Sequence, residues 1–431
     1  MNTSRSSFAQ SFFALLSVHA GTLLGGALLP IAMTRILGAE ALGVFTAAAS
    51  LGLLLLAVID WGYETRLPLL VSAEPLHAAR YLAEAQSTKI RLWLIAAILL
   101  IAYYALQSLV LSPAILLQSL HSSFLPLLLY AFWALARGMT GVYTATLRGL
   151  QHFGIIARIE NSLTVMVHLL AVGVLVLYDA WGQGYFSPST ILCAIVVCLL
   201  AGEVVKSLLF MRFLKQNDIK AGNMAAAVGW REIPMLPSHL VFVLLQALSI
   251  LQSRAGIYTL MALATTIEVG YFSAIARITI ALRIVPGTLF FVLVPHFVRS
   301  PEPKFLRKVF VIGLVVGIFG SLGLAFLADD IILLLYGTGF VHLAPVLRIA
   351  AGLFFLQTLM NILESYILAH NEEFFVSGAM LLILCAFALV CGIIPVKTAE
   401  WAAMASLGLE AALVLCYGVK VLLLIGKKKP L

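Results

Sequence analysis

The chain has 431 residues, of which 62% are apolar and only 11% are charged, and its formal net charge is +8. An average soluble domain has about 45–50% apolar and about 25% charged residues, so this composition excludes a typical soluble enzyme, a disordered chain, a nucleic-acid-binding domain and a coiled coil. Long unbroken apolar runs also argue against an outer-membrane barrel, whose strands alternate in polarity. The sequence therefore predicts an all-α polytopic membrane protein.

Twelve runs are long and apolar enough to form membrane-spanning helices, which need about 20 residues each. In chain order they cover residues 11–34, 41–59, 90–111, 123–147, 156–178, 190–213, 236–261, 270–295, 308–328, 345–368, 375–394 and 400–423. The first run is longer than the apolar core of a signal peptide, so we expect it to be retained. We predict an N-terminal six-helix lobe (1–213), a cytoplasmic linker (214–235) and a C-terminal six-helix lobe with a basic cytoplasmic tail (236–431).

Basic residues fall mainly on one side of this predicted topology. With the N-terminus in the cytoplasm, twenty of the 27 Lys and Arg residues lie in cytoplasmic segments, and only Arg35 and Lys397 lie outside. The positive-inside rule then places both termini in the cytoplasm. The positive charge is thus explained by topology, without nucleic acid as a partner. The other five basic residues lie inside predicted spans: Arg137, Arg254, Arg277, Arg283 and Arg348.

Two segments at an offset of 227 residues resemble each other. Gly43 matches Gly270 and Phe45 matches Phe272, and each segment opens the second helix of its half. Six helices per half is an even number, so both halves have the same orientation in the membrane. This pattern predicts a parallel repeat about a pseudo-two-fold axis along the membrane normal. Chance similarity in Ala-rich sequence is the alternative.

Several segments resemble those of a known transporter family. The resemblance is distributed in the right order over nearly the whole chain, in residues 30–43, 58–62, 146–153, 269–296 and 335–349. The family is the Wzx-type lipid-linked oligosaccharide flippases, in the MOP superfamily that includes the MATE exporters and lipid II flippases. The resemblance implies two six-helix lobes around a central cavity, alternating access, and a polyprenyl-pyrophosphate-linked sugar as cargo. Family members often have an Asp-Arg pair late in the seventh helix, whereas this chain has Ser253-Arg254, so a role for that Asp does not transfer.

The span arginines favour an anionic cargo. A charge inside a span costs at least about 2.5–3.5 kcal/mol at the membrane centre, so it normally faces a cavity or a partner. The acidic residues Asp60, Glu64, Glu160, Glu203 and Glu364 all lie towards the cytoplasmic ends of their helices, so we expect few acidic partners at the depth of the arginines. We therefore predict that Arg254, Arg277, Arg283 and Arg137 hold a pyrophosphate through forked hydrogen bonds. The alternative is that each Arg bonds backbone carbonyls or fixes a helix contact, and Arg348 can extend to the outer surface.

Helical periodicity adds polar candidates. On the span 236–261, Gln246, Ser253 and Arg254 share one face, and on the span 11–34 His19 shares a face with Thr22. We predict Gln246, Ser253 and His19 as further substrate-binding residues, with small-residue helix packing as the alternative.

Four other features are more simply structural. Tyr130 and Trp133 could stack on sugar rings but more simply pack against a neighbouring helix. His168 could titrate, although a hydrogen bond within its own helix is the simpler role. Glu203 and Lys206 have the spacing of a local ion pair. The five cysteines form no disulfide or metal-binding pattern.

Together these features predict a flippase of the bacterial inner (cytoplasmic) membrane. It would translocate an undecaprenyl-pyrophosphate-linked oligosaccharide to the periplasmic leaflet, without enzymatic chemistry, metal or cofactor. The expected partners are this glycan, membrane lipids and the polysaccharide polymerase and ligase machinery, and the expected state is a monomer. The alternatives are a MATE-like drug or cation antiporter and, from another class, a membrane glycosyltransferase or polymerase, for which the outer loops are too short.

Overall fold

The protein is built from helices that are long and apolar enough to cross a membrane. The computed structural model describes residues 8–110, 125–150, 152–182, 185–216, 237–282, 293, 297, 302–370, 372–394 and 397–426. Within these ranges every regular element is a helix, and eight of the helices could span a membrane by length and composition. The chain is therefore an all-helical, multi-pass membrane protein, as its composition predicts.

The N-terminal half consists of α1 (Phe8–Asp60), α2 (Tyr63–Ala73), the 3-10 turn η1 (Pro75–His77), α3 (Ala78–Val110), α5 (Leu125–Gly149), α6 (Phe153–Leu177), the π-helical turn η3 (Tyr178–Gly182) and α7 (Pro188–Gln216). The predicted spans 11–34 and 41–59 both lie in α1, which is interrupted at Gly38, where φ is +84°. This left-handed backbone conformation suits glycine because glycine has no Cβ. Helix α2 lies between the predicted spans 41–59 and 90–111, in a segment for which the sequence analysis predicts no helix.

The C-terminal half consists of α8 (Pro237–Ser253), α9 (Ala255–Leu263), α10 (Thr266–Leu282), α12 (Pro303–Phe326), α13 (Ala328–Tyr336), the 3-10 turn η4 (Thr338–Leu343), α14 (Ala344–Leu368), α15 (Glu373–Ile393) and α16 (Ala399–Gly426). The predicted span 236–261 is two helices, because the chain breaks at Arg254, where φ is −123° and ψ is 14°. Of the predicted span 270–295, residues 270–282 and Leu293 are described, and the other residues lie outside the described part of the chain.

The chain divides into two compact units whose boundaries fall within α1 and α8. Unit 1 comprises Met1–Ala32 and Ala48–Ala247, and unit 2 comprises Met33–Ala47 and Leu248–Leu431. A short stretch of α1 is thus part of unit 2, although the chain on both sides of it belongs to unit 1.

Unit 1 has an apolar core shared by α2, α3, α5, α6 and α7, which includes Tyr63, Leu67, Leu82, Val142, Tyr143, Ile156 and Phe210. Two glycines allow helices to approach closely in this unit. A methyl group added to Gly149 of α5 would lie 2.7 Å from Val71 of α2, and one added to Gly202 of α7 would lie 2.5 Å from Val167 of α6. Small residues at such contacts are typical of helix packing inside membranes.

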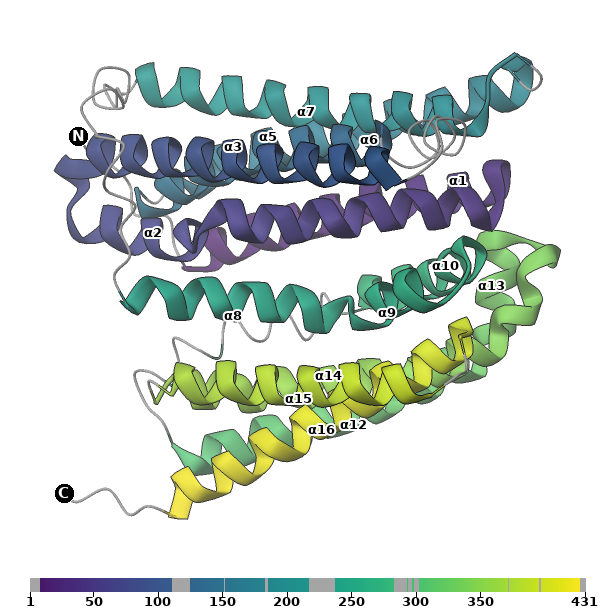
Figure 1. The fold of residues 1–431 in the computed structure, drawn as a ribbon. Coiled ribbons are helices and arrows are strands. Elements are labelled where there is room, and N and C mark those ends of the chain that lie inside the picture. Colours follow the sequence, from purple (N-terminus) through teal and green to yellow (C-terminus); the bar gives the residue numbers. More distant parts are fainter. Residues whose placement is uncertain are drawn as a thin grey trace. The chain divides into compact units, whose positions relative to one another are not determined.

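Unit 2 is organised around α14, which packs against α12 and α16 (Figure 1). Helix α14 also contacts α10. Gly313, Gly317 and Gly320 of α12 face Ile362, Phe355 and Phe354 of α14, so the larger side chains of α14 fill the space that the glycines leave. The opposite side of α12 exposes Phe319, Leu322 and Phe326. Large exposed apolar side chains along a span are what contact with lipid requires.

Candidate functional site

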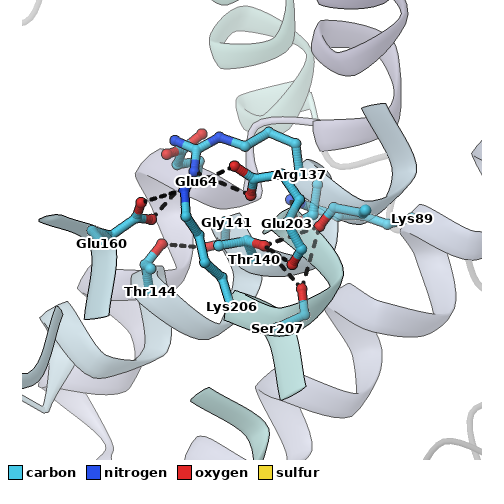
Figure 2. Close-up of polar contacts among 12 residues, drawn as sticks. Glu64, Lys89, Arg137, Thr140, Gly141, Thr144, Glu160, Glu203, Lys206 and Ser207 are labelled. Carbon is cyan, nitrogen blue, oxygen red and sulfur yellow. Dashed lines mark hydrogen bonds and ion pairs between the residues drawn. The ribbon is translucent and has the colours of Figure 1, made fainter. Parts of the chain in front are cut away.

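Four charged side chains inside unit 1 form a closed ring of alternating charge (Figure 2). Arg137 of α5 contacts Glu160 of α6 at 3.2 Å and Glu203 of α7 at 3.7 Å, both through Nη1. Lys206 of α7 contacts the same two carboxylates, Glu160 at 3.2 Å and Glu203 at 2.9 Å. Each cation therefore bridges two anions, and the ring ties three helices together.

Local sequence explains how the ring is assembled. Glu203 and Lys206 are three residues apart on α7, which places them on the same face of the helix. Thr140 lies one turn beyond Arg137 on α5, and its Oγ1 lies 2.9 Å from Ser207 Oγ and donates to the Glu203 carbonyl oxygen at 3.3 Å. These polar contacts fix α5 against α7 at the level of the ring.

The ring is buried except at one side chain. The side chains of Glu160, Glu203 and Lys206 are 8%, 9% and 5% exposed, whereas that of Arg137 is 33% exposed. Because Nη1 makes both ion-pair contacts, Nε and Nη2 hold the remaining hydrogen-bond donors of Arg137. Arg137 is therefore the accessible member of the ring, while Lys206 and both carboxylates stay covered.

Two further ion pairs extend this charged interior. Lys89 of α3 pairs with Asp60 at the end of α1, and both side chains are almost completely buried. Arg148 of α5 pairs with Glu64 of α2 at 3.2 Å. Gly141 of α5 lies between the two pairs, since a methyl group there would be 3.7 Å from Lys89 Nζ and 3.8 Å from a Glu64 carboxylate oxygen. The ring and the two pairs balance four acidic side chains with four basic ones.

The expectation that the span arginines have few acidic partners is wrong for two of them. Arg137 has the two carboxylates of the ring, and Arg348 pairs with Asp329, where both side chains are about half exposed. The predicted Glu203–Lys206 pair is confirmed. Lys206 is one of the twenty basic residues that the predicted topology assigns to cytoplasmic segments. In the structure it is buried in this ring, because Glu203, one turn away on the same helix, compensates its charge.

The other predicted arginines are only partly described. Arg254 is half-buried at the break between α8 and α9, where its amide donates to the Ile250 oxygen at 3.2 Å. Arg277 is half-buried in α10. Arg283 lies outside the described residues, so its predicted role stays a prediction.

The predicted polar contacts are dispersed along two helices. Ser253 is exposed at the end of α8, and its Oγ donates to the Ile250 oxygen at 3.0 Å. Gln246 is half-buried earlier in α8, and its buried Oε1 accepts no hydrogen bond from the part of the chain that the structure describes. His19 falls in α1, but its side chain is outside the described part. Substrate binding by these three residues remains a prediction.

Two of the structural alternatives from the sequence hold. Tyr130 is 3% exposed and packs against α1, where a methyl group on Gly52 would lie 3.2 Å away. Tyr130 also meets Trp133 edge to face, with ring centroids 5.7 Å apart. His168 Nδ1 lies 2.7 Å from the Thr164 oxygen one turn earlier in α6, the local hydrogen bond expected for a structural histidine.

The sequence analysis missed a buried carboxylate in unit 2. Glu410 of α16 is 2% exposed and accepts hydrogen bonds from Gln252 at 3.0 Å and Gln357 at 2.9 Å. Together with Ser253 and Ser406 it lines a cavity of 20 Å³, which has room for about one water molecule. The signal was available in the sequence, because Glu410 lies in the middle of the apolar run 400–423 and incurs the same cost that identified the arginines.

Long helices in two units, with charged side chains enclosed among them, define a polytopic membrane protein. No family model matches the chain, and no curated protein matches its sequence. Solved structures match it over nearly its full length, and three of them show that the chain shares its fold with a lipid II flippase and with two transporters described as members of the MOP superfamily.

The first is the lipid II flippase MurJ in an inward closed conformation, with a TM-score of 0.68, 14% identity, and coverage of 94% of this chain and 87% of the other. The second is a multidrug resistance MATE family transporter in an inward-facing conformation, with a TM-score of 0.63, 15% identity, and coverage of 97% and 100%. The third is a MOP superfamily transporter from Pyrococcus furiosus, with a TM-score of 0.61, 15% identity, and coverage of 99% and 100%. These structural neighbours are transporters and not enzymes.

Proposed function

We propose that the protein is a flippase of the bacterial inner membrane for an undecaprenyl-pyrophosphate-linked oligosaccharide, such as an O-antigen or other surface-polysaccharide repeat unit. It would move this lipid from the cytoplasmic to the periplasmic leaflet. Two independent lines support the proposal. The segments at 30–43 and 269–296 resemble oligosaccharide flippases, and the fold matches that of a lipid II flippase over 94% of the chain.

The observation that carries the proposal is the accessible face of Arg137. A guanidinium holds five N–H donors in a plane, and these match two phosphate oxygens at once. Arg137 uses Nη1 for its ion pairs and presents a one-third exposed side chain. A diphosphate can therefore engage the remaining donors without removing the charges that keep the ring neutral. We propose that Arg254, Arg277 and Arg283 contribute further positive charge to the same head group, with Gln246, Ser253 and His19 as polar contacts.

Transport would proceed by alternating access between two conformations. MATE transporters with this fold have been solved in inward-facing and outward-facing conformations. In our proposal this chain has twelve spans in two six-helix lobes with cytoplasmic termini, acts as a monomer, and passes its cargo to the polysaccharide polymerase and ligase machinery. No bond is made or broken in the cargo.

The test is complementation of a deletion strain, with lipid-linked sugar and surface glycan measured separately. We expect the deletion to accumulate a polyprenyl-linked sugar on the cytoplasmic side and the intact gene to restore export. Arg254→Ala and Arg277→Ala should each reduce export at normal protein level. Arg348→Ala is the matched control, since it removes an arginine that pairs with Asp329 and is half exposed. Normal export by both Arg254→Ala and Arg277→Ala would contradict the proposed role of these arginines. A deletion strain that accumulates no lipid-linked sugar would contradict the proposed cargo.

A second candidate, a MATE-like drug or cation antiporter, is favoured by Glu410. A cationic substrate or ion requires a carboxylate in the interior, and Glu410 lines the cavity of unit 2. If the protein is such an antiporter, the deletion strain should become sensitive to cationic drugs, and Glu410→Gln should reproduce that sensitivity. The flippase proposal expects unchanged drug sensitivity in both strains.

A further inference from the structure

Two glycines of unit 2, Gly43 and Gly270, each pack against the backbone of the segment that carries the other. A methyl group added to Gly43 of α1 would lie 2.0 Å from the carbonyl oxygen of Thr266, at the start of α10. A methyl group added to Gly270 of α10 would lie 1.8 Å from the carbonyl oxygen of Ala39 in α1. No side chain fits at either position, so the two backbones pack directly against each other.

The contact maps onto itself under the internal repeat. Ala39 and Gly43 become Thr266 and Gly270 when the offset of 227 residues is added. Gly43 thus contacts Thr266, the counterpart of Ala39, and Gly270 contacts Ala39, the counterpart of Thr266. Reciprocal contacts of this kind are the pattern of a two-fold, self-complementary interface. The offset of 227 residues comes from the amino-acid sequence alone, so the contact supports the repeat independently.

A third contact, also within unit 2, joins the same segment of α1 to α13. Arg35 donates from Nε to the Leu335 oxygen at 2.8 Å and from Nη2 to the Leu334 oxygen at 2.5 Å. These carbonyls belong to the last turn of α13, where helix oxygens lack partners within the helix and a cation is favourable. Tyr336 of the same turn in turn donates to the Ala274 oxygen of α10 at 2.8 Å.

We propose that these contacts are a conformational latch that closes in one transport state and opens in the other. The latch consists of Arg35, Ala39 and Gly43 on α1, Thr266 and Gly270 on α10, and the last turn of α13. This inference rests on the proposed function, in so far as transport requires two conformations. Beyond that function, the latch names the residues that stabilise one of the two conformations.

Three observations point to opening rather than to permanent packing. The segment Met33–Ala47 belongs to unit 2 while the flanking chain belongs to unit 1, so any displacement of one unit from the other acts on this segment. Gly38 interrupts α1 inside the segment with φ of +84°, which provides a pivot beside the contact. Glycine–carbonyl contacts have no interlocking side chains and are individually weak, so they separate without unpacking a core.

The test measures the latch directly with a cysteine pair, Ala39→Cys and Thr266→Cys, in full-length protein whose five native cysteines are replaced. We expect a bifunctional maleimide to cross-link the pair in the parent. Gly43→Ala places a methyl group against the Thr266 oxygen, so we expect about a fivefold lower yield, as a shift in the closed population would give. Gly323→Ala in α12 is the matched control, because a methyl group there meets nothing within 4 Å and should leave the yield unchanged.

Arg35→Gln tests the latch without adding bulk, in case Gly43→Ala does not fold. It removes two hydrogen bonds and should lower the cross-linking yield about twofold. Cross-linked protein should fail to export glycan, and the same protein without cross-linker should export it. Equal yields in Gly43→Ala, Arg35→Gln and Gly323→Ala, or normal export by the cross-linked protein, would overturn the latch. If only the proposed cargo is wrong, the deletion strain accumulates no lipid-linked sugar while the cross-linking yields keep this order.

Discussion

Lys206 offers the clearest test of the charged ring. Replacing it by methionine removes the contacts of 2.9 Å to Glu203 and 3.2 Å to Glu160, and leaves both buried carboxylates with Arg137 alone. Removing one partner of a buried ion pair costs about 3–5 kcal/mol, because the other charge stays buried. Arg137 still contacts both carboxylates, so we expect a loss near the lower end, about 3 kcal/mol.

Two companion variants separate this effect from a general loss of charge. Lys206→Met combined with Glu203→Gln removes one cation and one anion, so it restores neutrality and should recover at least half of the stability lost. Arg148→Gln breaks a pair whose side chains are both 35% exposed, and a pair of this kind contributes about 0–1 kcal/mol.

The assay is thermal unfolding of the purified protein in detergent, followed by tryptophan fluorescence at one heating rate. We expect the Tm to fall in the order Arg148→Gln, the double variant, then Lys206→Met. If Lys206→Met melts together with Arg148→Gln, or if the double variant melts below the single one, then the ring does not hold the helices as the geometry indicates.

Three further predictions follow from individual contacts. Gln252→Leu removes a donor to both oxygens of the buried Glu410, which should cost about 1.5–3 kcal/mol and be partly rescued by Glu410→Gln, as thermal unfolding of the two variants would show. Gly149→Ala forces a methyl group to 2.7 Å from Val71 and should lose about 1–3 kcal/mol, whereas Gly154→Ala, with nothing within 4 Å, should melt like the parent. Tyr336→Phe loses one hydrogen bond to the Ala274 oxygen and should lower stability by about 0.5–1.5 kcal/mol in the same assay.

Hydropathy was sufficient to predict the class of the protein and the approximate position of its helices. All twelve predicted apolar runs fall at least partly within helices of the structure, because a membrane span must satisfy its backbone internally and a helix is the structure that does so. Hydropathy did not predict the break at Arg254 or the separate helix α2. A helix break depends on tertiary contacts that a window of mean hydropathy does not record.

The candidate site was less predictable, for a physical reason. The cost of intramembrane charge identified Arg137 as a residue that needs a partner, but not which partner. Glu160 lies on a different helix 23 residues away, and Glu203 lies on a third. Only the packing of α5, α6 and α7 brings these charges together. The same cost applied to Glu410 identifies it as a residue that needs a partner, so the sequence carries the signal for this carboxylate as well.

The neutral ring also changes what anion binding at Arg137 requires. An isolated arginine in a membrane attracts an anion through its net charge over a long distance, whereas a ring of two cations and two anions has almost no such field outside itself. Attraction of a diphosphate to Arg137 must then come from directed N–H donors at short range. Lysine keeps the charge but has no planar fork, so Arg137→Lys should preserve the stability of the ring and still weaken binding of the head group. An Arg137→Lys variant that folds and exports glycan normally would show that the forked hydrogen-bond geometry of the guanidinium is not what the site supplies.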